Sequence, residues 1–254
     1  GATKMKIQLI RNATLRITYA GHTFLIDPYL GDKHAYETLG GNSPNPTVEL
    51  PMPAEDVIKG IEMVIVSHLH RDHFDEEAKR IVPKDMHIFC EPGDAPAILD
   101  QGFDNVKPIQ NTLQWEGIMI HRTPGAHGTG DWGDRMGTVS GFIFEADDEP
   151  TLYWMGDTIW YDEVKDIVQD NQPDVIVTHS SGAILGDSDP IVMDAKQTVA
   201  VCQTATQAIV VATHMDALDH GTITRASLRT YAHAKGISEH RLLIPEDGET
   251  LTFD

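Results

Sequence analysis

The strongest constraint on this chain is that short apolar β-strand patterns alternate with helix patterns along its 254 residues. The predicted strands are Ile7–Ile10, Leu15–Tyr19, Phe24–Ile26, Met63–Val66, His87–Cys90, Val106–Ile109, Leu113–Trp115, Ile118–Ile120, Val139–Phe144, Leu152–Met155, Val175–Val177, Ile209–Val211 and Arg241–Ile244. The predicted helices are Asp75–Val82, Ala95–Asp100, Tyr161–Gln169, Val192–Gln203 and Thr224–Ala234. Strand blocks that alternate with helices are typical of a layered α/β protein with its helices outside.

A long stretch without periodicity, Tyr29–Pro53, follows the third predicted strand and is rich in glycine and proline. Irregular segments of this length in a compact domain usually form lids or binding loops. We therefore expect it to cover a site or a subunit interface, which leaves a homo-oligomer open. The 28 residues before it are too few for a domain, so we predict one domain over residues 5–254. Residues 1–4, which precede Met5, are expected to be a cloning remnant.

The charge balance narrows the expected partners. The chain has 19 Lys and Arg against 39 Asp and Glu, a formal net charge of −20. Such a surface repels phosphate backbones and anionic lipid, so neither nucleic acid nor a membrane is an expected partner. The two cysteines, Cys90 and Cys202, form no CxxC pair, the apolar runs are short, and no secretory signal core stands out. These features predict a cytoplasmic protein with reduced thiols.

The densest chemical signal is Ser67-His68-Leu69-His70-Arg71-Asp72-His73, directly after the predicted strand Met63–Val66. Four potential metal ligands, His68, His70, Asp72 and His73, fall within six positions. In a turn that leaves a strand, alternate residues can point to one side. Neutral imidazole and carboxylate are the usual ligands of Zn²⁺ and similar ions. The segment therefore predicts a metal site.

Further potential ligands follow other predicted turns and strands. His127 lies in the glycine-rich turn Pro124–Gly130, Asp157 follows Leu152–Met155, and His214 follows Ile209–Val211. Residues just past strand ends converge on one rim of an α/β protein. Seven ligands suffice for two ions: three histidines for one, Asp72 and two histidines for the other, and one carboxylate between them.

This series of motifs resembles the metallo-β-lactamase superfamily, and most closely its compact branch of L-ascorbate-6-phosphate lactonase-like hydrolases. The stretches that carry the resemblance are Phe24–Tyr29, Val66–Asp75, Gly102–Val106 and Tyr153–Thr158. It covers nearly the whole chain from Met5. The resemblance implies a four-layer αββα sandwich. It indicates little about the substrate, because the same scaffold hosts many hydrolases.

The resemblance also assigns roles to the ligands. It implies one divalent ion on His68, His70 and His127 and a second on Asp72, His73 and His214. Asp157 is expected to bridge the two. Asp27 matches the early aspartate that steadies the HxHxDH turn. Mixed His and Asp sites suit zinc or manganese first, and iron or nickel as alternatives.

Such a centre predicts hydrolysis of a small ester, lactone or phosphoester. Two divalent ions about 3.5–4 Å apart hold a bridging hydroxide at near-neutral pH, so no Ser or Cys nucleophile is required. Asp72 and Asp157 are expected to orient the hydroxide and are both candidates to take its proton. His220 and His179 are candidate acids for the leaving group, on position alone.

Each of these candidates also has a plainer interpretation. His179 could be a hydrogen-bonded turn residue, and His220 could belong to the start of the helix near Thr224. Candidate substrate contacts are Arg135, Ser180 and Ser181. The alternative for Arg135 is a surface salt bridge.

Two other functions remain open at this point. A protein with intact ligands can bind metal and sense a metabolite without turnover. A phosphodiesterase or nuclease of the same superfamily would share the ligands, although the net charge of −20 disfavours it.

Overall fold

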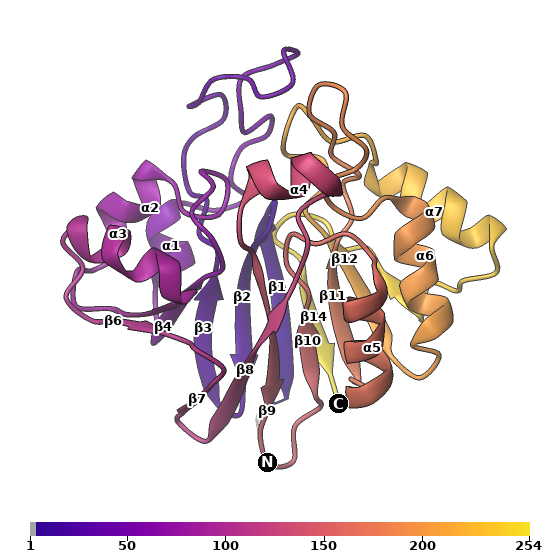
Figure 1. Cartoon of the computed structure of the whole chain (residues 1–254). Coiled ribbons are helices and arrows are strands. Elements are labelled where there is room, and N and C mark those ends of the chain that lie inside the picture. The colour runs from indigo at the N-terminus through magenta and orange to yellow at the C-terminus, as the bar shows by residue number, and fades with distance from the viewer. Residues whose placement is uncertain (1–3) are drawn as a thin grey trace.

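The computed structural model describes residues 4–254, so the expected cloning remnant lies outside the described residues except for Lys4. Over this range the strands form two seven-stranded mixed sheets that pack face to face (Figure 1). The first sheet runs in the order β14 (Thr250–Phe253), β1 (Met5–Arg11), β2 (Thr14–Tyr19), β3 (His22–Ile26), β4 (Met63–Val66), β5 (His87–Cys90) and β6 (Val106–Pro108). The second runs β13 (Leu242–Leu243), β12 (Ile209–Thr213), β11 (Val175–His179), β10 (Leu152–Trp154), β9 (Ser140–Glu145), β8 (Ile118–Pro124) and β7 (Thr112–Trp115).

Helices cover the outer face of each sheet, so the expected four-layer αββα sandwich is confirmed (Figure 1). The helices beside the first sheet are α1 (Ala54–Ile58), α2 (Glu76–Ile81), the short 3₁₀ turn η1 (Pro92–Asp94) and α3 (Ala95–Asp100). Those beside the second sheet are α5 (Asp162–Asn171), α6 (Ala195–Thr204) and α7 (Arg225–Ala234). One more helix, α4 (Gly130–Met136), lies across the top of the sandwich in Figure 1.

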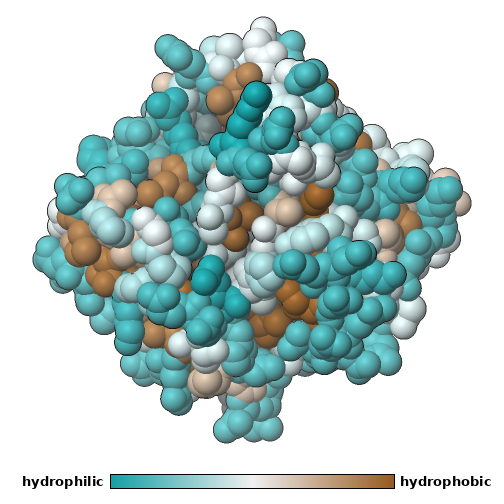
Figure 2. All heavy atoms as spheres, in the orientation of Figure 1, coloured by the Kyte–Doolittle hydropathy of each residue, from teal (hydrophilic) through white to brown (hydrophobic). Residues whose placement is uncertain are grey.

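The central core lies between the two sheets and is built from alternating strand residues. Leu15, Ile17 and Tyr19 on β2 are fully buried, and they face residues of the second sheet. Phe24 stacks on Phe144 across the interface, with ring centroids 5.4 Å apart. Hydrophilic side chains cover most of the face shown in Figure 2, with only scattered hydrophobic patches. None of the described helices is long and apolar enough to cross a membrane.

The structure corrects the sequence prediction at several element boundaries. The helix predicted from Val192 begins at Ala195, because the Asp194 side chain accepts a hydrogen bond from the Gln197 amide and caps the helix there. Two helices, α1 and α4, and the final strand β14 were not predicted. The stretch Tyr29–Pro53 is irregular, as expected, apart from a single β-bridge between Tyr36 and Asn45.

Strand direction explains where a site can form. β3 and β4 are parallel neighbours, and so are β10, β11 and β12. Their carboxyl ends therefore meet at one edge of the sandwich, the upper edge in Figure 1. The irregular stretch 29–53 and α4 lie at this same edge. Polar residues that directly follow these strands are thereby gathered from distant parts of the chain.

The Phe24–Phe144 contact should carry a large share of the inter-sheet stability. Phe144→Ala is expected to lower the free energy of unfolding by about 3 to 5 kcal/mol, because it empties a fully buried site. Leu99→Ala is the control, since Leu99 is 48% exposed on α3, and it should change stability by less than about 0.5 kcal/mol. Urea denaturation of the two variants measures both values, and equal effects would contradict this view of the core.

Candidate metal centre

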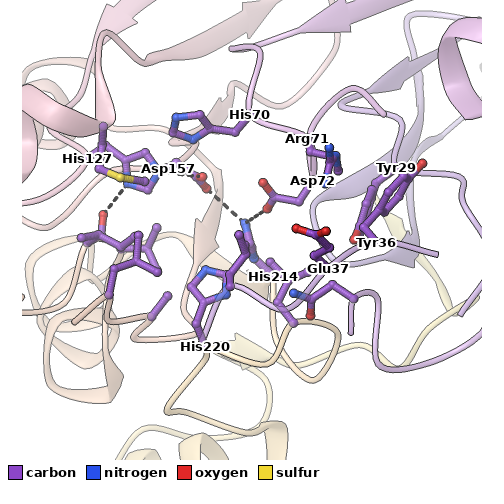
Figure 3. Close-up of a pocket in the computed structure, with 18 residues that line it drawn as sticks. Tyr29, Tyr36, Glu37, His70, Arg71, Asp72, His127, Asp157, His214 and His220 are labelled. Carbon is purple, nitrogen blue, oxygen red and sulfur yellow. Dashed lines mark hydrogen bonds and ion pairs between the residues drawn. The ribbon is translucent and has the colours of Figure 1, made fainter. Parts of the chain in front are cut away.

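The seven residues predicted as metal ligands come together at the shared edge, in two groups that overlap at Asp157. Five of them, His70, Asp72, His127, Asp157 and His214, are labelled in Figure 3. The first group is His68, His70, His127 and Asp157. The second group is Asp72, His73, His214 and Asp157. Within each group the potential ligand atoms all lie within 4.8 Å of one another. Both groups are therefore compact enough to surround a metal ion each.

In the first group, imidazole nitrogens converge on one carboxylate oxygen. Asp157 Oδ2 lies 3.4 Å from His68 Nε2 and 3.2 Å from His127 Nε2. His70 Nδ1 lies 3.1 Å from His68 Nε2. Three nitrogens and one oxygen thus face a common point, which is the donor set of a tetrahedral zinc-like site.

In the second group, two carboxylates face two imidazoles. His73 Nε2 lies 2.8 Å from Asp157 Oδ2 and 3.2 Å from Asp72 Oδ2. His214 Nε2 lies 3.1 Å from Asp72 Oδ2 and 3.3 Å from Asp157 Oδ1. Asp157 therefore offers oxygens to both groups, which is the arrangement a bridging carboxylate needs.

In His127 and His73, Nδ1 points away from Asp157 and contacts an acceptor. This contact fixes the direction of Nε2, the other ring nitrogen. His127 Nδ1 lies 2.8 Å from the carbonyl oxygen of Ile191, which can only accept, so Nδ1 donates. In the neutral ring, the Nε2 lone pair then faces the Asp157 carboxylate. His73 Nδ1 similarly lies 2.6 Å from Asp27 Oδ2. Two acceptors that face each other need a cation between them, so this donor set fits divalent ions.

The buried charges of the cluster compensate one another. Burial raises the pKa of the Asp157 carboxyl, but the neighbouring His73, His214 and His127 hold that pKa well below its usual range. Burial alone would lower the pKa of His73, yet the surrounding carboxylates, Asp157 first, raise it well above its ordinary value. Burial lowers the pKa of His68, which keeps that ring in the neutral form that ligates metal.

The backbone around the cluster is held in uncommon conformations. Gly156 has φ +75°, and a Cβ there would lie 2.8 Å from the Ser140 carbonyl oxygen, so the residue before Asp157 must be glycine. Asp27 and His214 also have positive φ, 51° and 67°. Such angles are uncommon for residues with side chains and concentrate at functional sites.

The structure places Asp27 and His179 behind the cluster. Asp27 is fully buried and accepts hydrogen bonds from the Ser67 amide at 2.7 Å and the Ser67 hydroxyl at 2.6 Å. It therefore holds the turn that carries His68 in place. His179 is fully buried, and its Nδ1 lies 2.6 Å from Asp157 Oδ1. Because it does not line the cavity beside the cluster, His179 orients Asp157 and is not placed to meet a substrate.

His220 lies on the cavity side of the cluster. The cavity has a volume of about 210 Å³ and opens onto His70, Asp72 and His214. His220 lines it beside His214 (Figure 3), and its side chain is only 8% exposed. Its Nδ1 has no hydrogen-bond partner among the described residues. Burial lowers the pKa of the ring.

The three predicted substrate contacts are not found at the cavity. Arg135 lies over the Trp132 ring, 4.9 Å from its centroid, and is not a lining residue. Ser180 is fully buried, with its hydroxyl 2.8 Å from that of Thr178 and 2.7 Å from that of Thr198. Ser181 is also buried away from the cavity lining. For Ser180 and Ser181, position after a strand does not show which way a side chain points, and the Arg135 side chain packs on Trp132 instead of lining the cavity.

Some residues of the site had no signal in the sequence. Asn12 follows β1, and its side-chain amide donates to the Asp72 backbone carbonyl and to Asp72 Oδ2, each at 3.2 Å. It sits in a tight turn with φ 59°, where Asn is common for backbone reasons alone. Apolar wall residues such as Leu39 and Leu218 come from irregular segments without periodicity.

Comparisons with known proteins agree with this geometry. The sequence matches the family described as beta-lactamase superfamily domain over residues 6–214. The UPF0173 protein YddR of Bacillus subtilis (strain 168) is 38% identical over 98% of this chain and 100% of its own length. The chain belongs to the beta-lactamase superfamily. Within that superfamily, its family is UPF0173, and the branch of L-ascorbate-6-phosphate lactonase-like hydrolases is not confirmed by these relatives.

Two solved structures resemble this UPF0173 chain over nearly its whole length. A possible metal-dependent hydrolase from Veillonella parvula DSM 2008 is 34% identical, with a TM-score of 0.94, covering 99% of this chain and 100% of its own. The isothiocyanate hydrolase from Delia radicum gut bacteria is 38% identical, with a TM-score of 0.93, covering 98% of this chain and 99% of its own. The protein is therefore a metal-dependent hydrolase, and its His/Asp clusters are the metal-binding candidates.

The Asp27 contacts yield a prediction for this hydrolase. Asp27→Asn should weaken metal binding by about 10- to 100-fold, because the amide no longer holds both His73 and Ser67 in place. Competition with a chelator measures the affinity. The matched control is Asp75→Asn, another fully buried carboxylate, which bonds to Leu30, Gly31 and Tyr36. That variant should lose stability but keep the metal affinity within about threefold, and equal losses of affinity would contradict the role given to Asp27.

Proposed function

We propose that this protein is a dinuclear hydrolase that adds water to a small, uncharged electrophile with an apolar substituent. The observation that carries the proposal is the pair of ligand groups that share Asp157 and open onto an apolar cavity. His68, His70 and His127 would hold one ion, and Asp72, His73 and His214 the other. When bound, such a pair lowers the pKa of water towards neutrality and polarises the electrophilic group of the substrate.

The chain's own carboxylates would orient the reaction. Asp72 lines the cavity and is fixed on its far side by Asn12 and His214. It is therefore positioned to accept a proton from the attacking water. Asp157 is held from behind by His179, so it stays in place while charge changes at the cavity. Asp72 would therefore transfer the proton, and Asp157 would keep its position.

The cavity wall favours a neutral substrate over a phosphoester. Among the described lining residues, Arg71 is the sole lysine or arginine, and its guanidinium lies over the Tyr36 ring and 3.5 Å from Glu76. A carboxylate, Glu37, lies at the same side of the cavity. The apolar lining residues are Leu39, Met136, Ala183, Leu185, Ile191, Val192 and Leu218. Such a wall stabilises alkyl or aryl groups and offers little to bind a phosphate.

Isothiocyanates are the substrate class that agrees both with the apolar cavity wall and with the name of one similar protein. The similar protein from Delia radicum gut bacteria is named an isothiocyanate hydrolase. In the balanced reaction, R–N=C=S and water give R–NH₂ and carbonyl sulfide. A C–O bond forms at the central carbon, the C–N bond breaks, and both protons of the water end on nitrogen. Small esters and lactones are the second class, since they present a similar electrophilic carbon.

His220 is the group we assign to the leaving nitrogen. Its ring lines the cavity and is almost enclosed, with Nδ1 buried 3.8 Å from Asp219 Oδ1. The neutral ring in this position can donate a hydrogen bond to the nitrogen as the C–N bond breaks, while the protons that reach the nitrogen come from the attacking water through Asp72.

Metal content is the first measurement. Elemental mass spectrometry on protein purified without chelators should find about two ions per chain. His127→Ala should retain about one, because only the first group is disrupted, and Asp157→Ala should lose both. One ion or none in the wild type, even after reconstitution, would refute the dinuclear centre.

Activity is tested on propyl isothiocyanate, a small lactone and a phosphodiester. We expect amine release from the isothiocyanate and no phosphodiester cleavage; the reverse result would favour a phosphodiesterase. His220→Gln should lower kcat by about 10² to 10⁴-fold while the metal content stays unchanged. His121→Gln is the control, since His121 lies on β8 and bonds to Glu145 away from the cavity. A His220→Gln enzyme with wild-type kcat would remove His220 from the reaction.

A further inference from the structure

One carboxylate outside the metal centre binds an unusually large number of donors from a single segment. The segment is residues 36–45, here called the lid, and the carboxylate belongs to Asp219. Asp219 accepts hydrogen bonds from the backbone amides of Leu39 at 3.2 Å, Gly40 at 2.9 Å and Asn42 at 3.3 Å. The Thr38 hydroxyl and the Asn45 side chain donate to it as well. The backbone amide of Asp219 donates in return to Asn45 Oδ1 at 2.8 Å.

The carboxylate at the centre of these bonds is itself shielded from water. The Asp219 side chain is 1% exposed, although the lid around it is largely on the surface. Burial raises the pKa of the Asp219 carboxyl, but the Thr38, Asn45 and backbone donors outweigh burial and hold it well below its usual range. A buried carboxylate with this many donors is a strong and specific anchor. The lid is also tied to the rest of the chain at Tyr36, whose hydroxyl donates to Asp75 Oδ2 at 2.6 Å.

The same anchor joins the lid to His220. A Cβ added at Gly40 would lie 3.3 Å from both Cα and Cβ of His220, so the lid backbone rests directly on that residue. On the other side, the backbone amide of Ile184 donates to the His220 carbonyl at 3.2 Å. Asp219 thus holds the lid and His220 in one fixed arrangement over the cavity.

The anchor also places an apolar side chain at the cavity. Leu39 lines the cavity and yet is 57% exposed, the highest value among the large hydrophobic residues described as exposed. Leu218, Leu185 and Met136 line the same cavity. An exposed leucine beside a reactive centre gains free energy when a bound apolar group covers it. The substrate itself is the molecule that enters there.

We propose that Asp219 is a positioning residue that clamps the lid so that Leu39 contacts the apolar substituent of the substrate and thereby sets a preference for long substituents. The proposal rests on the proposed function for the identity of the substrate. The clamp itself does not depend on the reaction, because it is a set of contacts in the free protein.

The clamp is tested by hydrogen exchange. In Asp219→Asn the new amide group faces backbone donors, so the amides of residues 38–43 should exchange at least about tenfold faster than in the wild type. Metal content should stay unchanged. The matched control is Asp216→Asn, which removes a carboxylate from the same segment that bonds to Arg225 and not to the lid. Unchanged exchange in Asp219→Asn would overturn the clamp, and so would an equal increase in the control.

The preference for long substituents is tested with methyl, butyl and hexyl isothiocyanate as substrates. Leu39→Ala should lower kcat/KM for the hexyl compound by about tenfold, chiefly through KM, and for the methyl compound by less than about twofold. Asp219→Asn should show the same dependence on chain length. Leu99→Ala, which alters an exposed leucine far from the lid, should show none. A loss independent of chain length would overturn the proposal.

A separate binding experiment distinguishes failure of the proposed function from failure of this inference. If no isothiocyanate is hydrolysed, the proposed substrate is wrong. Calorimetric binding of the unreactive pair N-methylthiourea and N-hexylthiourea then tests the lid. Tighter binding of the hexyl compound that Leu39→Ala abolishes would support the inference, and equal binding of the two compounds would overturn it.

Discussion

The contact on which the rest of the site depends is the burial of Asp157 among five imidazoles. Its carboxylate lies 2.6 to 3.4 Å from nitrogens of His68, His73, His127, His179 and His214. An isolated buried carboxylate costs several kcal/mol, so it persists only where positive charge or donors surround it. The first two histidines follow β4 of one sheet and the other three belong to the second sheet. The site therefore spans the two sheets, and neither sheet alone could form it.

The elements and ligands that the sequence predicted well share one physical basis. Apolar runs such as Met63–Val66 are strands buried on both faces, so their pattern is visible without tertiary information. Polar residues directly after parallel strands must then meet at one edge, which is why His68, Asp157 and His214 were recognisable. α4 was not predicted because glycines at 130 and 133 disfavour a helix, and only tertiary contacts decide its conformation.

The residues that sequence reasoning missed act through contacts between distant segments. Asp219 bonds to residues 174 to 181 positions away, and nothing in the sequence beside it differs from an ordinary polar turn. The direction of Ser180 depends on its bonds to Thr178 and Thr198, which a sequence pattern does not encode. Strand ends can be predicted from local patterns, whereas the loops that shape a cavity depend on which segment packs against which.

The contrast between the two sides of the cavity explains how one scaffold can combine strong charge with an apolar substrate. The strand ends provide a largely buried cluster whose carboxylates and imidazoles compensate one another. The irregular segments provide the opposite wall, where Leu39, Leu185 and Leu218 exclude water from the region next to the charges. Electrostatic interactions strengthen where water is excluded, so the apolar wall increases the effect of the polar cluster. Because rigid strands hold the cluster, the loops can change the accepted substrate without disturbing the metal ligands.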